Sequence, residues 1–118
     1  KSDENLLPKG KGNIMVKKFL QKVEENYHKN LPVNEYAGML AITPNHLTQT
    51  VTLLTGKTTS QIIKAKQVLE IKRLLVHTNL SVTEIAGRLN FPDKSYFTKF
   101  FKRETGVSPL QYRAKQME

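Results

Sequence analysis

An internal repeat constrains the fold of this chain more than any other feature of its sequence. The segments 31–63 and 80–113 align with a one-residue gap near the middle, and identical residues keep their spacing on both sides of it. The identical pairs are Leu31/Leu80, Val33/Val82, Glu35/Glu84, Ala37/Ala86, Gly38/Gly87, Leu40/Leu89, Thr48/Thr98, Thr55/Thr105, Gly56/Gly106 and Gln61/Gln111. A fixed internal period indicates that one structural unit is used twice.

The second copy opens with a helix whose start and end are both marked. Ser81 and Glu84 have the S-x-x-E spacing of a capping box, in which each side chain pairs with a free amide at the helix start. Apolar residues follow at helical spacing, and Asn90 suits the left-handed turn that closes the helix. Gly87 lies within the helix, where a glycine usually lets another helix approach closely. We therefore expect a short amphipathic helix that ends in a tight turn.

A second helix follows Pro92, with Asp93 as its predicted N-cap. Its inward side carries Phe97, Phe100, Phe101 and Glu104, and its outward side carries Lys94, Ser95, Thr98, Lys99 and Lys102. Ser108 and Pro109 then open a short third helix. A helix–turn–helix with polar and cationic residues on its second helix is typical of DNA binding, because a helix fits the major groove. An ordinary helical hairpin with a solvated polar face fits the same pattern, but the duplication favours DNA binding.

The remaining segments extend or connect the two copies. Residues 1–12 read as a flexible linker or arm. A helix is expected from about Asn13 to His28, with Val16, Phe19, Leu20, Val23 and Tyr27 facing inward. A long helix from about Ser60 to His77 is apolar on two sides, as expected for a rod held between two lobes. The sequence predicts an all-α, homeodomain-like fold of about seven helices: a first subdomain (13–58), a connecting helix (59–78) and a second subdomain (79–118).

The charge of the chain favours a nucleic acid or an anionic membrane as partner. The 118 residues carry a net charge of +9 with a pI near 9.9, and most of the excess lies after residue 58. A membrane-surface role for the basic central helix is the weaker reading, because the two lobes already account for its apolar sides. The absence of cysteine excludes disulfides and thiolate zinc sites. No signal peptide or run of 18 apolar residues is visible, so an intracellular protein is expected.

Two such units joined by a central helix, with KSYFTKFFKRETGVSPLQYR at the end, resemble the DNA-binding domain of the AraC/XylS family of bacterial transcription regulators. The resemblance covers about residues 13–115. The first copy departs from the family pattern at Ala41, where the family prefers glycine, and at Val51 and Leu54. In the central helix Gln67 and Ile71 replace an arginine and an alanine. The resemblance implies that each copy lays its second helix in the major groove, in successive turns on one face of the DNA.

The resemblance also places the residues expected to contact DNA. In the first copy they are Asn45, Thr48 and Gln49, with His46 and Thr52 close by; in the second copy they are Lys94, Ser95, Thr98, Lys99 and Lys102. Pro44 to Thr55 contains no Lys or Arg, whereas Asp93 to Thr105 contains four such residues. Because Asn and Gln suit adenine and Lys suits guanine or phosphate, we expect the first copy to discriminate between bases. We expect the second copy to supply more of the electrostatic affinity.

The expected partners follow from the same resemblance. They are double-stranded DNA, an upstream sensor domain of the same chain, and RNA polymerase, which cations such as Arg88 or Arg103 would contact. The expected location is the bacterial cytoplasm and nucleoid. The chain begins at Lys1 and not at Met, which suggests a fragment of a longer regulator. The alternative is a helical protein-interaction module that has lost DNA binding. No cofactor, metal site, membrane partner or enzymatic activity is expected. Four further residues are expected to pack in the core: Tyr36, Tyr96, Leu110 and Tyr112.

Overall fold

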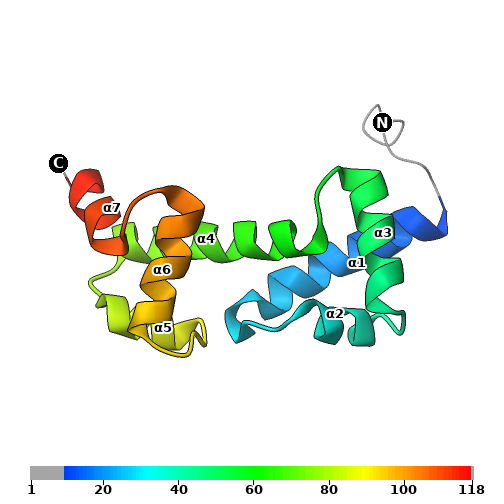
Figure 1. The fold of residues 1–118 in the computed structure, drawn as a ribbon, viewed down its shortest axis with the longest axis horizontal. Coiled ribbons are helices and arrows are strands. Elements are labelled where there is room, and N and C mark those ends of the chain that lie inside the picture. Colours follow the sequence, from blue (N-terminus) through cyan, green and yellow to red (C-terminus); the bar gives the residue numbers. More distant parts are fainter. Residues whose placement is uncertain (1–9, 118) are drawn as a thin grey trace. The chain divides into compact units, whose positions relative to one another are not determined.

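The computed structural model describes residues 10–117, and all of the regular structure in this range is helical (Figure 1). The elements are α1 (Lys11–Asn26), the 3₁₀ helix η2 (Tyr27–Lys29), α2 (Val33–Met39), α3 (Pro44–Thr55), α4 (Thr59–His77), α5 (Val82–Arg88), α6 (Lys94–Thr105) and α7 (Pro109–Gln116). Seven α-helices without a strand in the described range confirm the expected all-α class. Most of the expected arm lies outside the described residues, and α1 begins two residues before Asn13.

The helices form two compact units, each of which contains one copy of the repeat. Unit 1 comprises residues up to Tyr27 together with Leu31–Lys64, and unit 2 comprises His28–Asn30 together with the chain from Ala65 onward. The division therefore falls within α4, whose first residues belong to unit 1 and whose remainder belongs to unit 2.

Unit 1 is built around an aromatic pair between α1 and α2. The rings of Phe19 and Tyr36 meet edge to face with centroids 5.7 Å apart. The buried residues of this core are Val16, Phe19, Val23, Tyr36, Ala37, Leu47, Val51 and Ile63. Leu20 was expected on the inward side and is 44% exposed, so that prediction is wrong. Each residue turns a helix by about 100°, which moves Leu20 away from the Phe19 face.

Unit 2 has a core of aromatic side chains from α6 and the turn before it. Phe91 packs against Phe97 and Phe100 with ring centroids 5.2 and 5.1 Å apart. Phe101 meets Tyr112 of α7 at 5.7 Å, which confirms Tyr112 as a packing residue. Leu110 is 59% exposed, so the same expectation is wrong for this residue.

The C-terminal end of α4 is held by a side chain of α7. Arg113 donates from Nε to the carbonyl of Leu75 at 2.9 Å and from Nη2 to that of Thr78 at 3.4 Å. The last carbonyls of a helix have no partner within the helix, so this guanidinium satisfies groups that would otherwise need water. Arg113 therefore has a structural role within unit 2.

The turns of the two copies have the same backbone course. Ala41 and Asn90 both adopt left-handed conformations, with φ of 58° and 59°. The next residue in each turn donates back to the alanine carbonyl of the preceding helix, Ile42 to Ala37 and Phe91 to Ala86. Asn90 is thus confirmed as the turn residue. The expectation for Gly87 is wrong, because a Cβ added there would meet nothing within 4 Å, so no helix packs against it.

A hydrogen-bond network ties the turn before α6 to the segment His28–Asn30, which also belongs to unit 2. Asn90 donates from Nδ2 to the carbonyl of His28 at 2.9 Å, and its own carbonyl accepts from Asn30 Nδ2 at 3.2 Å. Gln67, only 3% exposed, donates to Asn30 Oδ1 at 2.9 Å. These three bonds fix the loop from which α6 starts.

Candidate nucleic-acid interface

Three of the residues expected to contact DNA form a ridge along α6. Ser95, Lys99 and Lys102 are all exposed and lie four and then three residues apart, which puts them on one side of the helix. Lys94 is exposed at the first turn, and Thr98 is half-buried at the edge of the ridge. The helix thus presents a hydroxyl and two ammonium groups in a row.

Two local features hold this ridge outward. Asp93 accepts from the backbone N–H of Tyr96 at 2.8 Å, which confirms it as the N-cap. On the opposite side of α6, Phe97, Phe100 and Phe101 are buried. Because three aromatic anchors fix one face, the residues about half a turn away must point to solvent.

The first copy has a ridge at the matching positions of α3. Asn45, Gln49 and Thr52 are exposed with the same four-then-three spacing. His46 is exposed beside them, and its backbone N–H donates to the hydroxyl of the N-cap Thr43 at 3.1 Å. Amide and hydroxyl groups therefore occupy in α3 the places that a hydroxyl and two lysines occupy in α6.

Thr48 differs from the other candidates of α3. It is half-buried, and its hydroxyl lies 3.3 Å from that of the buried Thr59 in α4. The matching residue of α6, Thr98, is also half-buried. Both threonines lie beside the ridges and not on them, so their side chains are less available to a ligand than Gln49 or Lys99.

The two ridges differ in charge. Helix α3 contains no charged residue, whereas α6 contains four cations and one anion. Arg103 pairs with Glu104 at 3.5 Å, and its guanidinium lies 5.8 Å from the ring of Phe100. Lys99 and Lys102 have no ion-pair partner in the described part of the chain. Their ammonium groups are free to meet an anionic ligand.

Sequence reasoning missed one residue at this surface. Tyr96 was expected in the core together with Phe97, but it is 54% exposed, and its ring centroid lies 6.2 Å from that of Phe91. The repeat predicts the exposure of Tyr96, because Tyr96 aligns with His46, a residue expected to lie near DNA. On α3 of unit 1, the apolar side chain of Leu53 is 82% exposed.

Residues 10–117 contain no group of three or more His, Cys, Asp or Glu side chains placed to hold a metal ion. No helix among them combines the length and the apolar character needed to span a bilayer.

Comparison with known proteins gives concordant results. A family model described as a helix-turn-helix domain matches residues 36–115. The uncharacterized HTH-type transcriptional regulator YpdC of Escherichia coli K12 is 28% identical over 105 residues, which is 89% of this chain and 37% of YpdC. This chain thus spans little more than a third of that relative.

Two solved structures resemble the fold at similar identity. The C-terminal domain of AraT, a response regulator from Geobacillus stearothermophilus, superposes with a TM-score of 0.81 and 26% identity, covering 86% of this chain and 84% of that domain. The DNA-binding domain of the global transcriptional factor AdpA, solved in complex with a target DNA, gives a TM-score of 0.76 and 28% identity, covering 85% and 90%.

Proposed function

Since this chain belongs to the AraC family of helix-turn-helix transcription regulators, we propose that it binds duplex DNA sequence-specifically by placing α3 and α6 in successive major grooves. This family consists of DNA-binding domains of transcription regulators and is not an enzyme family. The proposal depends most on one observation: Asn45, Gln49 and Thr52 are exposed on α3 at the positions that match the exposed Ser95, Lys99 and Lys102 on α6.

The chemistry of the ridges supports a division of labour. The side-chain amides of Gln49 and Asn45 each have an NH2 group that donates and a carbonyl oxygen that accepts. One such amide matches the donor and the acceptor that adenine presents in the major groove. Lys99 and Lys102 offer donors only, and they suit guanine or a phosphate. In the proposal, α3 discriminates between bases, and α6 contributes more of the salt-dependent affinity.

The AdpA complex supports DNA binding by a domain of this kind, since 85% of this chain superposes on a domain solved with its target DNA.

We extend the proposal to a longer bacterial regulator in the cytoplasm, in which another part of the polypeptide receives the signal. Arg88, exposed at the end of α5, is the more available candidate for a contact with RNA polymerase, because Arg103 is paired with Glu104. Replacing Arg88 with alanine should then lower activated transcription at unchanged DNA affinity.

Selection of bound sites from a random duplex pool tests the main proposal. We expect two half-motifs about 34 Å apart, the distance of one helical turn. The Gln49→Ala variant should lose preference in one half-motif, and the Lys99→Ala variant should change the other. Enrichment of a single half-motif would contradict the use of both helices, and failure to enrich any motif would contradict sequence-specific binding.

The alternative, a protein-interaction module, is motivated by the uncharged α3 and by Leu53, which is 82% exposed there. Titration with random duplex DNA at low salt separates the two functions. Non-specific binding by a protein of this charge should be measurable at micromolar concentration. No binding under these conditions would favour the interaction module.

A further inference from the structure

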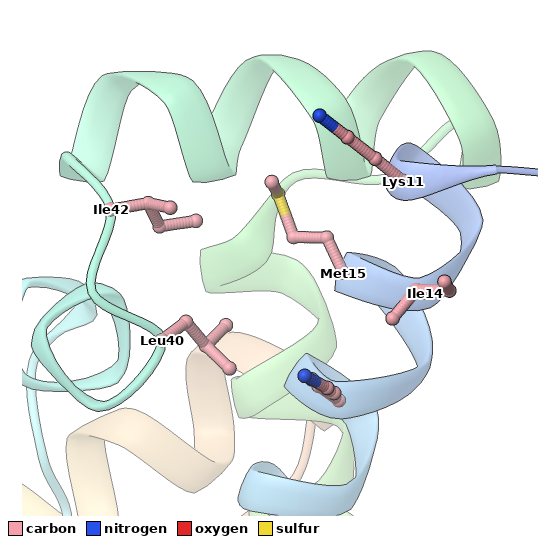
Figure 2. A pocket seen from close by; sticks show the side chains of 6 residues that line it. Lys11, Ile14, Met15, Leu40 and Ile42 are labelled. Carbon is pink, nitrogen blue, oxygen red and sulfur yellow. The ribbon is translucent and has the colours of Figure 1, made fainter.

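Unit 1 contains a groove on α1 that the proposed DNA contacts do not use. It lies between α1 and the turn that joins α2 to α3, where Met15 extends toward Ile42 (Figure 2). The hollow has a volume of about 190 Å³ and is lined by Lys11, Ile14, Met15, Lys18, Leu40 and Ile42. A second hollow of about 350 Å³ shares Lys18 and Leu40 and adds Gln21, Lys22, Met39 and Ala41. Because they share these two residues, the two hollows adjoin each other beside α1, and together they are here called the α1 groove.

The floor of the α1 groove is apolar and incompletely covered. Ile14 and Met39 are 52% and 40% exposed. Neighbouring Met15, Leu40 and Ile42 are half-buried. Apolar side chains grouped at one place on a surface indicate a contact site, and methionine adapts its shape to a partner more readily than branched residues do.

The rim of the α1 groove is cationic. Lys11, Lys18 and Lys22 line it, and no acidic residue does. Lys22 pairs with Glu25 at 3.6 Å, but Lys11 and Lys18 form no ion pair with any other described residue. The lysines span three turns of α1, a length of about 16 Å at 1.5 Å per residue. A ligand complementary to this surface carries an apolar stripe flanked by carboxylates.

We propose that the α1 groove binds an acidic amphipathic helix of about three turns from a protein partner. Such a helix places an apolar stripe, spaced by three and four residues, on the floor formed by Ile14, Met15 and Met39, in the way of other helix-in-groove complexes. Its flanking Asp or Glu side chains meet Lys11 and Lys18. A nucleic-acid backbone would pair with the lysines but would gain nothing from the apolar floor, and this disfavours it as the occupant.

Fluorescence anisotropy with a labelled 12-residue helical peptide tests this proposal. The peptide has Leu at positions 3, 7 and 10 and Glu at the flanking positions. The matching peptide with Lys in place of every Glu serves as the ligand control. We expect Lys18→Glu to weaken binding of the acidic peptide about five-fold, because an exposed attraction becomes a repulsion. Ile14→Asn should weaken binding about ten-fold, because an apolar contact on the floor is lost.

Two matched variants on α1 lie outside the groove and separate a local effect from a general one. Lys17→Glu changes the net charge as Lys18→Glu does, and Leu20→Asn exposes a polar group as Ile14→Asn does; both native residues are exposed and neither lines the groove. Both variants should bind the acidic peptide as the unmodified chain does, and circular dichroism should show all four variants folded.

Several results would overturn the proposal. Equal binding of the two peptides would show that the lysines do not select the ligand by its charge. Equal losses in Lys17→Glu and Lys18→Glu would show a general electrostatic attraction and no groove. If Lys18→Glu weakens duplex DNA binding as much as peptide binding, the lysines contact phosphates. The proposed DNA binding is tested separately by site selection and does not depend on any of these outcomes.

Discussion

The second helices of the two repeats, α3 and α6, are each 12 residues long and end in the same way. In each, a threonine of the last turn, Thr55 or Thr105, donates to the carbonyl four residues earlier, and a left-handed glycine follows. Their outward ridges nevertheless share no residue. Because caps and buried side chains determine where each helix lies, the exposed ridge is free to take on a different chemistry in each copy.

The turns before these helices differ in how they are stabilised. Asn90 exchanges hydrogen bonds with the segment His28–Asn30, and the buried Gln67 completes that network. Ala41 occupies the same left-handed conformation with a side chain that cannot form a hydrogen bond. An alanine in this conformation is strained by about 1 kcal/mol. Unit 2 therefore holds its turn by specific polar contacts, and unit 1 relies on packing around the turn.

The largest effect should come from the buried anchors of the two helices, Leu47 in α3 and Phe97 in α6, which are both 0% exposed. We expect Phe97→Ala to lower the free energy of unfolding by about 4 kcal/mol and Leu47→Ala by about 3 kcal/mol, because the larger side chain leaves the larger cavity. Urea unfolding followed by circular dichroism measures both. A larger effect at Leu47 would contradict the view that the aromatic cluster anchors α6 more firmly.

The next effect concerns the turn of unit 2. Asn90→Ala should lower the free energy of unfolding by about 2 kcal/mol, since it combines left-handed strain with the loss of the bond to His28. Asn90→Gly keeps the conformation, loses that bond and adds freedom to the unfolded chain, so about 1.5 kcal/mol is expected. Urea unfolding of both variants checks this. Equal effects of the two substitutions would mean that backbone strain is unimportant at this turn.

The ridges should differ in what they contribute to DNA binding. Gln49→Ala should remove about 1–2 kcal/mol of discrimination between bases and leave the salt dependence unchanged. Lys102→Ala should weaken all sequences alike and reduce the slope of log affinity against log salt by about 0.9, from a value near −5 for about six neutralised phosphates. Anisotropy titrations of selected and altered duplexes between 50 and 200 mM salt measure both quantities. If Gln49→Ala weakens every sequence equally, the assignment of base discrimination to α3 is wrong.

Many helix ends and turns could be predicted from the sequence, because the residues that specify them lie close together along the chain. The capping box at Ser81, the N-cap Asp93 and the left-handed Asn90 are each specified by residues within three positions. The network around Gln67 could not be predicted, because its partners lie 37 to 62 residues apart along the chain. Tyr96 was misplaced for another reason: it adjoins the buried Phe97, but one residue around a helix changes which face is exposed.

A smaller effect is expected at the turn of unit 1. Ala41→Gly should raise the free energy of unfolding by about 0.5 kcal/mol, because the strain relieved in the left-handed turn exceeds the added freedom of glycine in the unfolded chain. Ala114→Gly in the exposed part of α7 is the matched control, and it should lower stability by about 1 kcal/mol. Thermal and urea unfolding measure both variants. A loss of stability in Ala41→Gly would indicate that the methyl group of Ala41 packs usefully in the turn.

The smallest expected effect is on stability, and it comes from the capping box at the start of α5, which α2 does not have. Ser81 donates its backbone N–H to Glu84 Oε1 at 2.7 Å, whereas the matching N-cap in unit 1 is Pro32, which has no N–H to donate. This bond, helped by the charge of Arg88, lowers the pKa of Glu84 below its ordinary value of 4.5.

A carboxyl group with a lowered pKa in the folded state stabilises the fold above its unfolded pKa, and this contribution is lost as the pH falls through the folded value. Glu84→Ala should therefore be less stable than the unmodified chain at pH 7, and the difference should shrink below about pH 4.5. Urea unfolding between pH 7 and pH 3 measures it, with Glu35→Ala of unit 1 as the matched variant. The same pH-dependent loss in Glu35→Ala would show that the capping box is not its cause, because Pro32 cannot supply the donor on which the effect depends.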